Sequence, residues 1–187
     1  MKKLFTALVA LVLSLSVSAQ FYIYCSNGDV LEVDSISLVK PDNSNNHEDN
    51  SNNHEYVDLG LPSGLKWATC NVGATTPEEY GYYFAWGETQ PKKNYDWTTY
   101  KYGTNYDQLT KYCNNSYWGK DGFTDNKTVL DPEDDAATMN WGGAWRMPTI
   151  AEQQELLSNC TWTWTTQNGV NGYKVTGPNR NSIFLPA

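Results

Sequence analysis

Two groups of acidic side chains have the chemistry, but not the spacing, of a cation site. Calcium prefers several carboxylate oxygens, and the first group supplies four carboxylates within five residues. Neither group has the glycine and ligand spacing of a calcium loop, and helix capping explains acidic residues at a helix start. We therefore predict no metal and no other cofactor. The first group is Asp131, Glu133, Asp134 and Asp135, and the second is Asp121, Asp125 and Asn126.

The residue types needed for catalysis lack an arrangement that would use them. His47 and His54 are the only histidines, and they lie in two copies of the segment NSNNHE, residues 43–48 and 50–55. This polar repeat can be a metal-binding tract or a flexible spacer, and histidines so isolated favour the spacer. A nucleophile needs a base within hydrogen-bond reach, and glycoside hydrolysis needs two carboxylates at a defined separation. Because no spacing indicates either, we predict no enzyme.

Aromatic side chains are the strongest functional signal in the sequence. The chain has 8 Trp and 13 Tyr, and many lie in a polar, irregular segment, residues 87–128, which we name the aromatic loop. Rings with a polar tip bind well at interfaces, and they can stack on sugar rings. A loop this long is usually functional, but its rings can also fill the core beneath it. The candidate ligand-binding residues are Trp97, Tyr100, Tyr102, Tyr106, Tyr117 and Trp118.

The first 19 residues have the three parts of a secretory signal peptide. Lys2 and Lys3 form a positive start, residues 4–15 are almost entirely apolar, and residues 17–19 (VSA) form a small-residue cleavage site. The apolar run is too short to cross a bilayer, and no later stretch is longer. The net charge of −8 argues against nucleic acid as a partner. We therefore expect a secreted or cell-surface protein without a transmembrane segment.

The cysteines favour structural bonds over chemistry. None has the close spacing of a zinc or redox motif, and disulfides are permitted outside the cytoplasm. Four cysteines allow three full pairings, and the sequence does not choose among them. We predict at least one disulfide, with Cys25, Cys70, Cys113 and Cys160 as the candidates.

The sequence after the signal peptide divides into three parts. Residues 20–41 predict a β-hairpin, because β-prone runs flank an Asn-Gly turn at residues 27 and 28. Residues 42–55 contain no apolar side chain and predict a disordered linker. Residues 56–187 have the alternating patterns of a folded main domain.

The main domain combines strand and helix signals. Helices are expected at 131–140 and 149–159, because Asp131 and Thr149 are good caps and Glu152 completes a capping box with Thr149. The pattern predicts an α+β domain with two short helices and a β-meander. Strands are expected at 57–59, 65–70 and 80–86, and the meander strands at 161–165, 173–176 and 182–185.

Three segments resemble the Fibrobacter succinogenes major paralogous domain family. They are YVDLGLPSGLKWATCNVGA at residues 56–74, YGYYFAWGE at 80–88 and WGGAWRMPT at 141–149. The resemblance covers residues 56–187 and implies a C-type-lectin-like fold in an exported, often surface-attached protein. The stretch WRMPT also resembles a core motif of formylglycine-generating enzymes, but none of the cysteines here maps onto their catalytic ones. Structural roles are expected for Trp141, Trp145, Arg146, Pro148, Thr149 and Glu152.

Two departures from the family bear on the fold. Family members usually continue beyond residue 187 with further strands, so we expect the C-terminal part of the domain to be missing. Apolar surface would then be exposed around Trp162, Trp164 and Phe184, with low stability or self-association. Arg180 stands at a turn position where the family often has glycine, so a left-handed backbone there would be strained.

Three functions remain open on the sequence. The first is a secreted or cell-surface binding module for a glycan or protein ligand, using the aromatic loop. The second is a structural surface or adhesion component without a small-molecule ligand. The third is a glycan-processing enzyme, for which the acidic residues would have to supply a catalytic pair.

Overall fold

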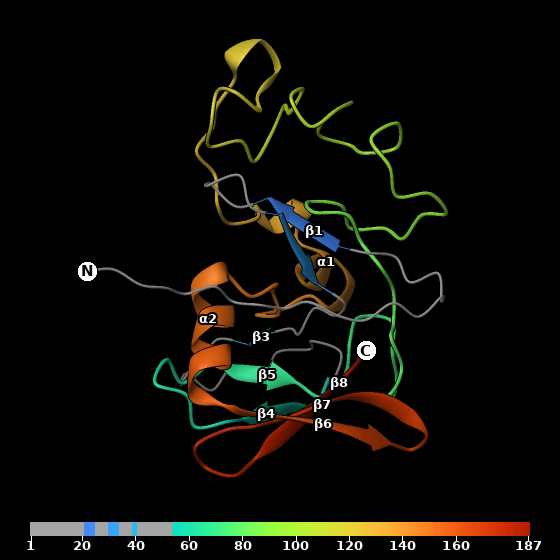
Figure 1. Ribbon diagram of the computed structural model, residues 1–187, viewed down its shortest axis with the longest axis vertical. Coiled ribbons are helices and arrows are strands. Elements are labelled where there is room, and N and C mark those ends of the chain that lie inside the picture. The colour runs from blue at the N-terminus through green and yellow to red at the C-terminus, as the bar shows by residue number, and fades with distance from the viewer. Residues whose placement is uncertain (1–20, 25–29, 34–38, 41–53) are drawn as a thin grey trace, which may run out of the picture.

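The computed structural model describes residues 21–24, 30–33, 39–40 and 54–187 (Figure 1). The predicted signal peptide, Cys25, the predicted hairpin turn and residues 42–53 of the predicted linker lie outside the described residues. Strands β1 (Phe21–Tyr24) and β2 (Val30–Val33) pair antiparallel, as expected for a hairpin. The described part is a mixed α+β structure of small antiparallel sheets and short helices.

Each of two three-stranded sheets is antiparallel throughout. The first has the order β3 (Val39–Lys40), β5 (Lys66–Ala68) and β4 (Tyr56–Asp58). The second is the predicted meander, β6 (Thr161–Gln167), β7 (Val170–Thr176) and β8 (Ser182–Pro186). A two-residue turn joins β6 to β7, and its Asn168 and Gly169 have φ of 48° and 85°. Positive φ at both positions is typical of the tight hairpin turn that an Asn-Gly pair favours.

The turn between β7 and β8 contacts the end of β4 and so connects the two three-stranded sheets. The side-chain amides of Asn179 and Asn181 donate to the backbone carbonyl of Asp58, at 2.9 and 2.8 Å. Gly177 lies so close to the neighbouring backbone that a Cβ there would be 2.0 Å from the Leu59 carbonyl oxygen. Only glycine fits this approach, so the turn and the end of β4 lie in direct contact.

Helix α2 (Ile150–Asn159) begins where the capping box predicts. The Thr149 hydroxyl accepts from the Glu152 backbone N–H at 3.4 Å, and the Glu152 carboxylate accepts from the Thr149 backbone N–H at 2.7 Å. Arg146 donates two hydrogen bonds to the same carboxylate, at 2.8 and 2.5 Å. Arg146 therefore bridges the preceding loop to the helix, which is the role expected for it.

The first predicted helix is shorter than expected and has a different cap. Residues 131–140 divide into a 3-10 turn, η2 (Pro132–Asp134), and helix α1 (Ala136–Trp141). The break falls at Asp135, whose backbone is extended and whose carboxylate accepts the N–H groups of Ala137 and Thr138, both at 2.9 Å. Asp135, not Asp131, is therefore the cap of the α-helix. A second 3-10 turn, η1 (Lys120–Gly122), lies in the aromatic loop.

The strand expected at residues 80–86 is not formed. Gly81 has φ of 70°, and a Cβ there would lie 2.3 Å from the Val72 carbonyl oxygen. The next residue, Tyr82, donates its backbone N–H to that same carbonyl at 2.7 Å. The chain is therefore bent onto residue 72 by a left-handed glycine, and a bent chain cannot continue a sheet ladder.

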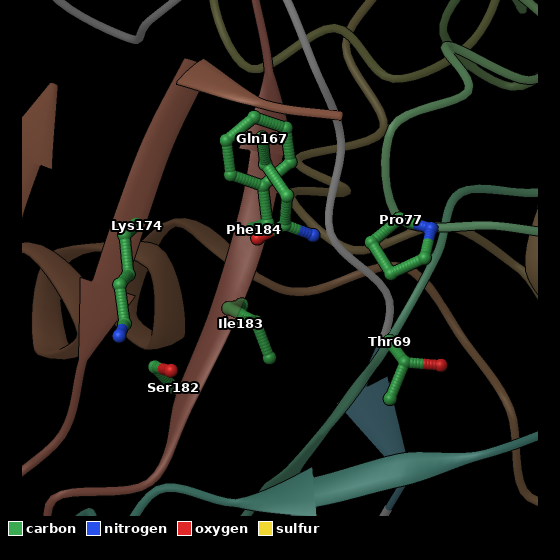
Figure 2. A pocket seen from close by; sticks show the side chains of 7 residues that line it. All are labelled: Thr69, Pro77, Gln167, Lys174, Ser182, Ile183 and Phe184. Atoms are coloured by element: carbon green, nitrogen blue, oxygen red, sulfur yellow. The ribbon is translucent and has the colours of Figure 1, made fainter. Parts of the chain in front are cut away.

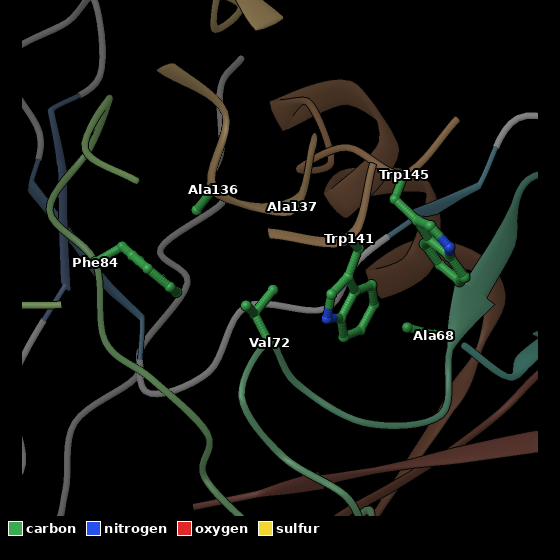
Figure 3. Close-up of a cluster of buried hydrophobic side chains, with 7 residues drawn as sticks. All are labelled: Ala68, Val72, Phe84, Ala136, Ala137, Trp141 and Trp145. Carbon is green, nitrogen blue, oxygen red and sulfur yellow. The ribbon is translucent and has the colours of Figure 1, made fainter. Parts of the chain in front are cut away.

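Two clusters of buried apolar side chains form the core. The first surrounds Trp141 and Trp145, whose rings meet edge to face with centroids 5.0 Å apart (Figure 3). The second joins both three-stranded sheets to α2 through side chains from β5, α2, β7 and β8. These side chains include Trp67, Leu156, Val175 and Ile183.

Of the apolar side chains expected to be exposed near the C-terminal strand, Trp164 is exposed and Phe184 is buried. Phe184 is only 4% exposed, so the prediction that its ring lies on the surface is wrong. Trp162 is half-buried against the second core cluster, whereas Trp164 is 55% exposed. Exposed apolar surface therefore lies on β6 rather than on β8.

Arg180 has the left-handed backbone expected for it, with φ of 73°. A side chain in this region costs about 1–2 kcal/mol, whereas glycine adopts it freely. We expect Arg180→Gly to raise the free energy of unfolding by about 0.5–1 kcal/mol, after the greater entropy of glycine in the unfolded chain is subtracted. Chemical denaturation would measure the change. Arg180→Ala is the control, because it removes the guanidinium but keeps the strain, and an equal gain in both variants would contradict the explanation.

Candidate functional site

The aromatic loop extends away from the sheets at one end of the molecule, where it is drawn in green to yellow (Figure 1). It has no regular strand, but isolated bridges join Leu109 to Gly103 and to Gly119. Leu109 donates its backbone N–H to the Trp118 carbonyl at 3.0 Å, and Lys120 donates to the Leu109 carbonyl at 2.9 Å. Residue 109 is therefore the point at which the two halves of the loop meet.

A single buried carboxylate anchors this loop to the body of the domain. Asp134 is 1% exposed, and it accepts hydrogen bonds from side chains at two places in the loop. Lys101 donates to Oδ1 at 2.9 Å, and the Tyr102 hydroxyl donates to the same oxygen. Lys111 and the Tyr112 hydroxyl donate to Oδ2, at 2.5 and 2.8 Å. We call these five residues the Asp134 cluster.

The Asp134 cluster keeps its carboxylate ionised. Burial raises the pKa of Asp134, but the hydrogen bonds from Lys111, Tyr102, Lys101 and Tyr112 outweigh burial and hold this pKa well below its usual range. Burial and the adjacent carboxylate raise the pKa of Tyr112 to about 12, so its hydroxyl remains a donor. The charges and protons of the cluster are therefore fixed near neutral pH, which suits an anchor better than an acid or base catalyst.

Three of the six candidate ligand-binding residues support the loop from within. Trp97, Tyr100 and Tyr102 are half-buried and form a row of edge-to-face rings, with centroids 5.8 and 6.2 Å apart. The Tyr100 hydroxyl donates to the Trp86 carbonyl at 3.0 Å, and Tyr102 belongs to the Asp134 cluster. These rings fill the space beneath the loop, which is the alternative role that the sequence left open.

The other three candidates gather on the surface of the loop. The Trp118 ring meets those of Tyr106 and Tyr117 edge to face, with centroids 5.7 and 4.8 Å apart. Tyr106 is 44% exposed and Tyr117 is 67% exposed, while Trp118 is half-buried beside them. We call Tyr106, Tyr117 and Trp118 the outer ring cluster, and it presents aromatic surface to solvent from a fixed arrangement.

Uncharged polar residues precede the two exposed rings of the outer ring cluster in the chain. Asn105 precedes Tyr106, and the exposed residues Asn114, Asn115 and Ser116 precede Tyr117. The Asn115 side-chain oxygen accepts the Tyr117 backbone N–H at 2.9 Å, and the Asn105 oxygen accepts the Tyr106 backbone N–H at 2.8 Å. These bonds fix the backbone before each ring and use only the amide oxygens.

Four of the acidic residues considered for cation sites have other partners. Asp131 pairs with Lys111 and Lys127, at 2.7 and 2.6 Å, and Asp134 and Asp135 accept the bonds described above. Asp125 accepts the backbone N–H groups of Tyr112, Cys113 and Lys127, so it closes the loop rather than facing a cation. Within the described ranges, no three His, Cys, Asp or Glu side chains are grouped as a metal site would require.

The three described cysteines are free thiols. Cys113 is buried, and Cys70 and Cys160 are half-buried. Burial is the largest cause of a raised pKa at both Cys70 and Cys160, which lowers their reactivity as nucleophiles. A bond between any two of these three is absent from the structure, and Cys25 lies outside the described residues.

A small pocket lies near the C-terminal sheet, far from the aromatic loop in the fold (Figure 2). Its volume is about 120 Å³. Ligand pockets usually measure roughly 300–1,000 Å³, so this pocket is too small for a sugar or cofactor. It is lined by Thr69, Pro77, Gln167, Lys174, Ser182, Ile183 and Phe184.

Sequence reasoning did not identify Lys101, Lys111 and Tyr112 as members of a site. One signal was present: the dipeptide Lys-Tyr occurs at residues 101–102 and again at 111–112, in a chain with only 13 basic residues. Each dipeptide places one lysine and one tyrosine on the same carboxylate oxygen of Asp134. Their shared partner lies 22 or more residues away, and nothing local indicates it.

Comparisons with protein-family models, curated proteins and solved structures found no match to the chain. Among the residues that the structure describes, none belongs to a helix with the length and hydrophobicity needed to cross a membrane. The function must therefore be inferred from the chemistry of the described residues.

Proposed function

We propose that this chain is a secreted or cell-surface binding module that takes a neutral glycan on its outer ring cluster. Export rests on the signal-peptide pattern of the first 19 residues. We further propose that residues 56–187 form a C-type-lectin-like domain of the Fibrobacter succinogenes major paralogous family. The α+β architecture is compatible with that fold, and the motif WGGAWRMPT supplies core rings and a helix cap, as such a domain requires.

One observation carries the proposal: Tyr106, Tyr117 and Trp118 gather their rings at the surface of a loop that is otherwise polar. Exposed aromatic rings are costly to hydrate and are enriched where proteins bind ligands. The Asp134 cluster holds the loop that carries them, so little ordering entropy would be lost on binding. A pre-arranged ring surface of this kind suits a ligand with a flat apolar face.

The neighbours of the rings favour a glycan over a protein or a charged ligand. A hexose presents C–H groups on one face and hydroxyls at its rim, so it needs aromatic faces together with neutral donors and acceptors. The amides of Asn105, Asn114 and Asn115 and the hydroxyl of Ser116 supply these next to the rings in the chain. A catalytic role is not proposed, because Asp125, Asp131 and Asp134 are held in ion pairs and hydrogen bonds.

Binding of the full chain to a panel of insoluble polysaccharides and arrayed glycans tests this function. We expect binding to at least one neutral glycan and a loss of about tenfold or more in Tyr117→Ala and Trp118→Ala, because a central ring typically contributes more than about 1.4 kcal/mol. Tyr82→Ala is the matched control, since Tyr82 is also an exposed tyrosine, at 54%, outside the loop. Binding should persist in a chelator, because the described residues contain no group of three His, Cys, Asp or Glu side chains that could hold a metal.

Two results would contradict the proposal. If Tyr117→Ala and Trp118→Ala bind a glycan as well as the wild-type chain does, the outer ring cluster is not the site. If the chain binds no glycan but retains a protein ligand that both variants lose, the partner is a protein. Absence of any ligand would leave the structural role as the better account.

A further inference from the structure

Among the described residues, the outer edge of β6 lacks the features that usually protect the edge of a sheet. Edge strands are usually blunted by lysine, proline, a bulge or short length. Strand β6, TWTWTTQ, is seven residues long, has none of these residues, and pairs with β7 in seven consecutive steps without a bulge. It lies at the end of the order β6-β7-β8, so one of its edges has no strand partner among the described residues.

The backbone groups that face this outer edge can be identified from the hairpin. Gln167 and Val170 flank the two-residue turn, and residues in that position exchange both of their hydrogen bonds. Every second residue of β6 from Gln167 therefore bonds to β7. The N–H and C=O groups of the residues between them, Trp162, Trp164 and Thr166, point away from β7, and the described residues provide no partner for them.

We propose that the occupant of this edge is β6 of a second copy of the chain, paired antiparallel about a two-fold axis at Trp164. An antiparallel pair of identical strands is self-complementary, as a two-fold interface requires. Centring the pair on residue 164 sets Trp164 against its own copy and Trp162 against Thr166. This is the one register in which all three outward-facing residues of each copy form hydrogen-bonded pairs.

Charge favours a second copy at this place. The chain has a net charge of −8, so two copies repel over most of their surfaces. Strand β6 has no charged residue, and like charges would not face each other across the axis. The axis would also bring together two exposed rings, because Trp164 is 55% exposed and its ring meets that of Tyr173 of β7 edge to face, with centroids 4.9 Å apart. The result is a continuous six-stranded sheet.

Substituting a charged residue of either sign for Trp164 tests both the pairing of the two β6 strands and its register. The molar mass of the full chain in solution, measured by light scattering during size exclusion, is expected to be twice that of the monomer. Trp164→Lys and Trp164→Glu should each give half that mass, because the axis places two like charges opposite each other. An equimolar mixture of the two variants should regain the dimer mass. Tyr82→Lys, at an exposed site away from β6, is the control and should remain dimeric.

Each other outcome overturns the proposal. A monomeric wild-type chain would exclude a second copy, and protection of the 162, 164 and 166 amides from hydrogen exchange in that monomer would assign the edge to another segment of the same chain. A mixture that stays monomeric would exclude the Trp164-centred register. Masses above that of a dimer would show open association rather than a closed pair. Cooperative thermal unfolding of both charged variants establishes that they are folded.

Discussion

Replacing Asp134 with alanine is expected to lower the free energy of unfolding by roughly 3 kcal/mol and to release the aromatic loop. Breaking a buried ion pair from one side typically costs about 3–5 kcal/mol, because it leaves its partners uncompensated. The lower value applies here because Lys101 is more than half exposed and solvent screens its charge. Urea denaturation would give the change in stability, and limited proteolysis would report cleavage within residues 87–128.

Two further variants test whether the charge of the Asp134 carboxylate itself provides this stability. Glu133→Ala removes an exposed acid one residue earlier and should leave stability almost unchanged. Asp134→Asn keeps the shape but loses the charge, and we expect it to fall between the wild-type chain and the alanine variant. An Asp134→Ala variant with near wild-type stability and an intact loop would show that Asp134 is not the anchor.

The same carboxylate sets a pH dependence whose direction is fixed by its lowered pKa. A group with a folded-state pKa below its unfolded value stabilises the fold above the unfolded pKa, about 3.9 for Asp, and loses that effect as the pH falls towards the folded pKa. The stability difference between the wild-type chain and Asp134→Asn should therefore be constant at neutral and mildly acidic pH. It should shrink only below about pH 4.

Trp145→Ala is expected to cost roughly 3–5 kcal/mol, the usual range for removing a large buried aromatic ring. Trp145 is 1% exposed, and its ring lies against Trp141 and Tyr56, at centroid distances of 5.0 and 6.5 Å. The cavity would open between β4 and α1, because the ring lies between Tyr56 of β4 and Trp141 of α1. Urea denaturation would measure the loss.

An exposed ring provides the control for this cavity. Tyr117 is 67% exposed, and Tyr117→Ala should change the free energy of unfolding by less than about 0.5 kcal/mol. The two variants remove comparable rings from opposite environments, so their difference isolates burial. A loss below about 1 kcal/mol in Trp145→Ala would show that the site collapses onto the missing ring.

Sequence patterns correctly predicted the elements whose structure depends on residues that are close together in the chain. The capping box at Thr149 and Glu152 placed the start of α2, whereas the second meander strand, expected from residue 173, begins at Val170. Alternation predicted β6 because each of its residues has a partner nearby in the chain. In these cases the residues that decide the structure lie close together in the chain, at most 15 positions apart in the pairing of β6 with β7.

Signals failed where the partner that decides the structure is not indicated by the local pattern. Residues 80–86 have the composition of a strand, but the left-handed Gly81 and the Val72 carbonyl bend them out of any sheet. Asp131 reads as a helix cap, but its carboxylate pairs with Lys111 and Lys127, and Asp135 caps the helix instead. For the same reason, the six candidate ligand-binding residues divide between the space beneath the loop and its surface. The sequence does not reveal which rings pack inward beside the Asp134 cluster.

The contact between Asp58 and the turn at residues 177–181 has a consequence for how quickly the domain folds. The bonds from Asn179 and Asn181 to the Asp58 carbonyl join residues 121 and 123 positions apart. Contacts of such high contact order form late, because the entropy of closing the long intervening chain is lost before they stabilise anything. While the chain is being synthesised, β4 has no partner in that turn until residue 181 has emerged. The contact between the first sheet and the last one can therefore form only near the end of synthesis.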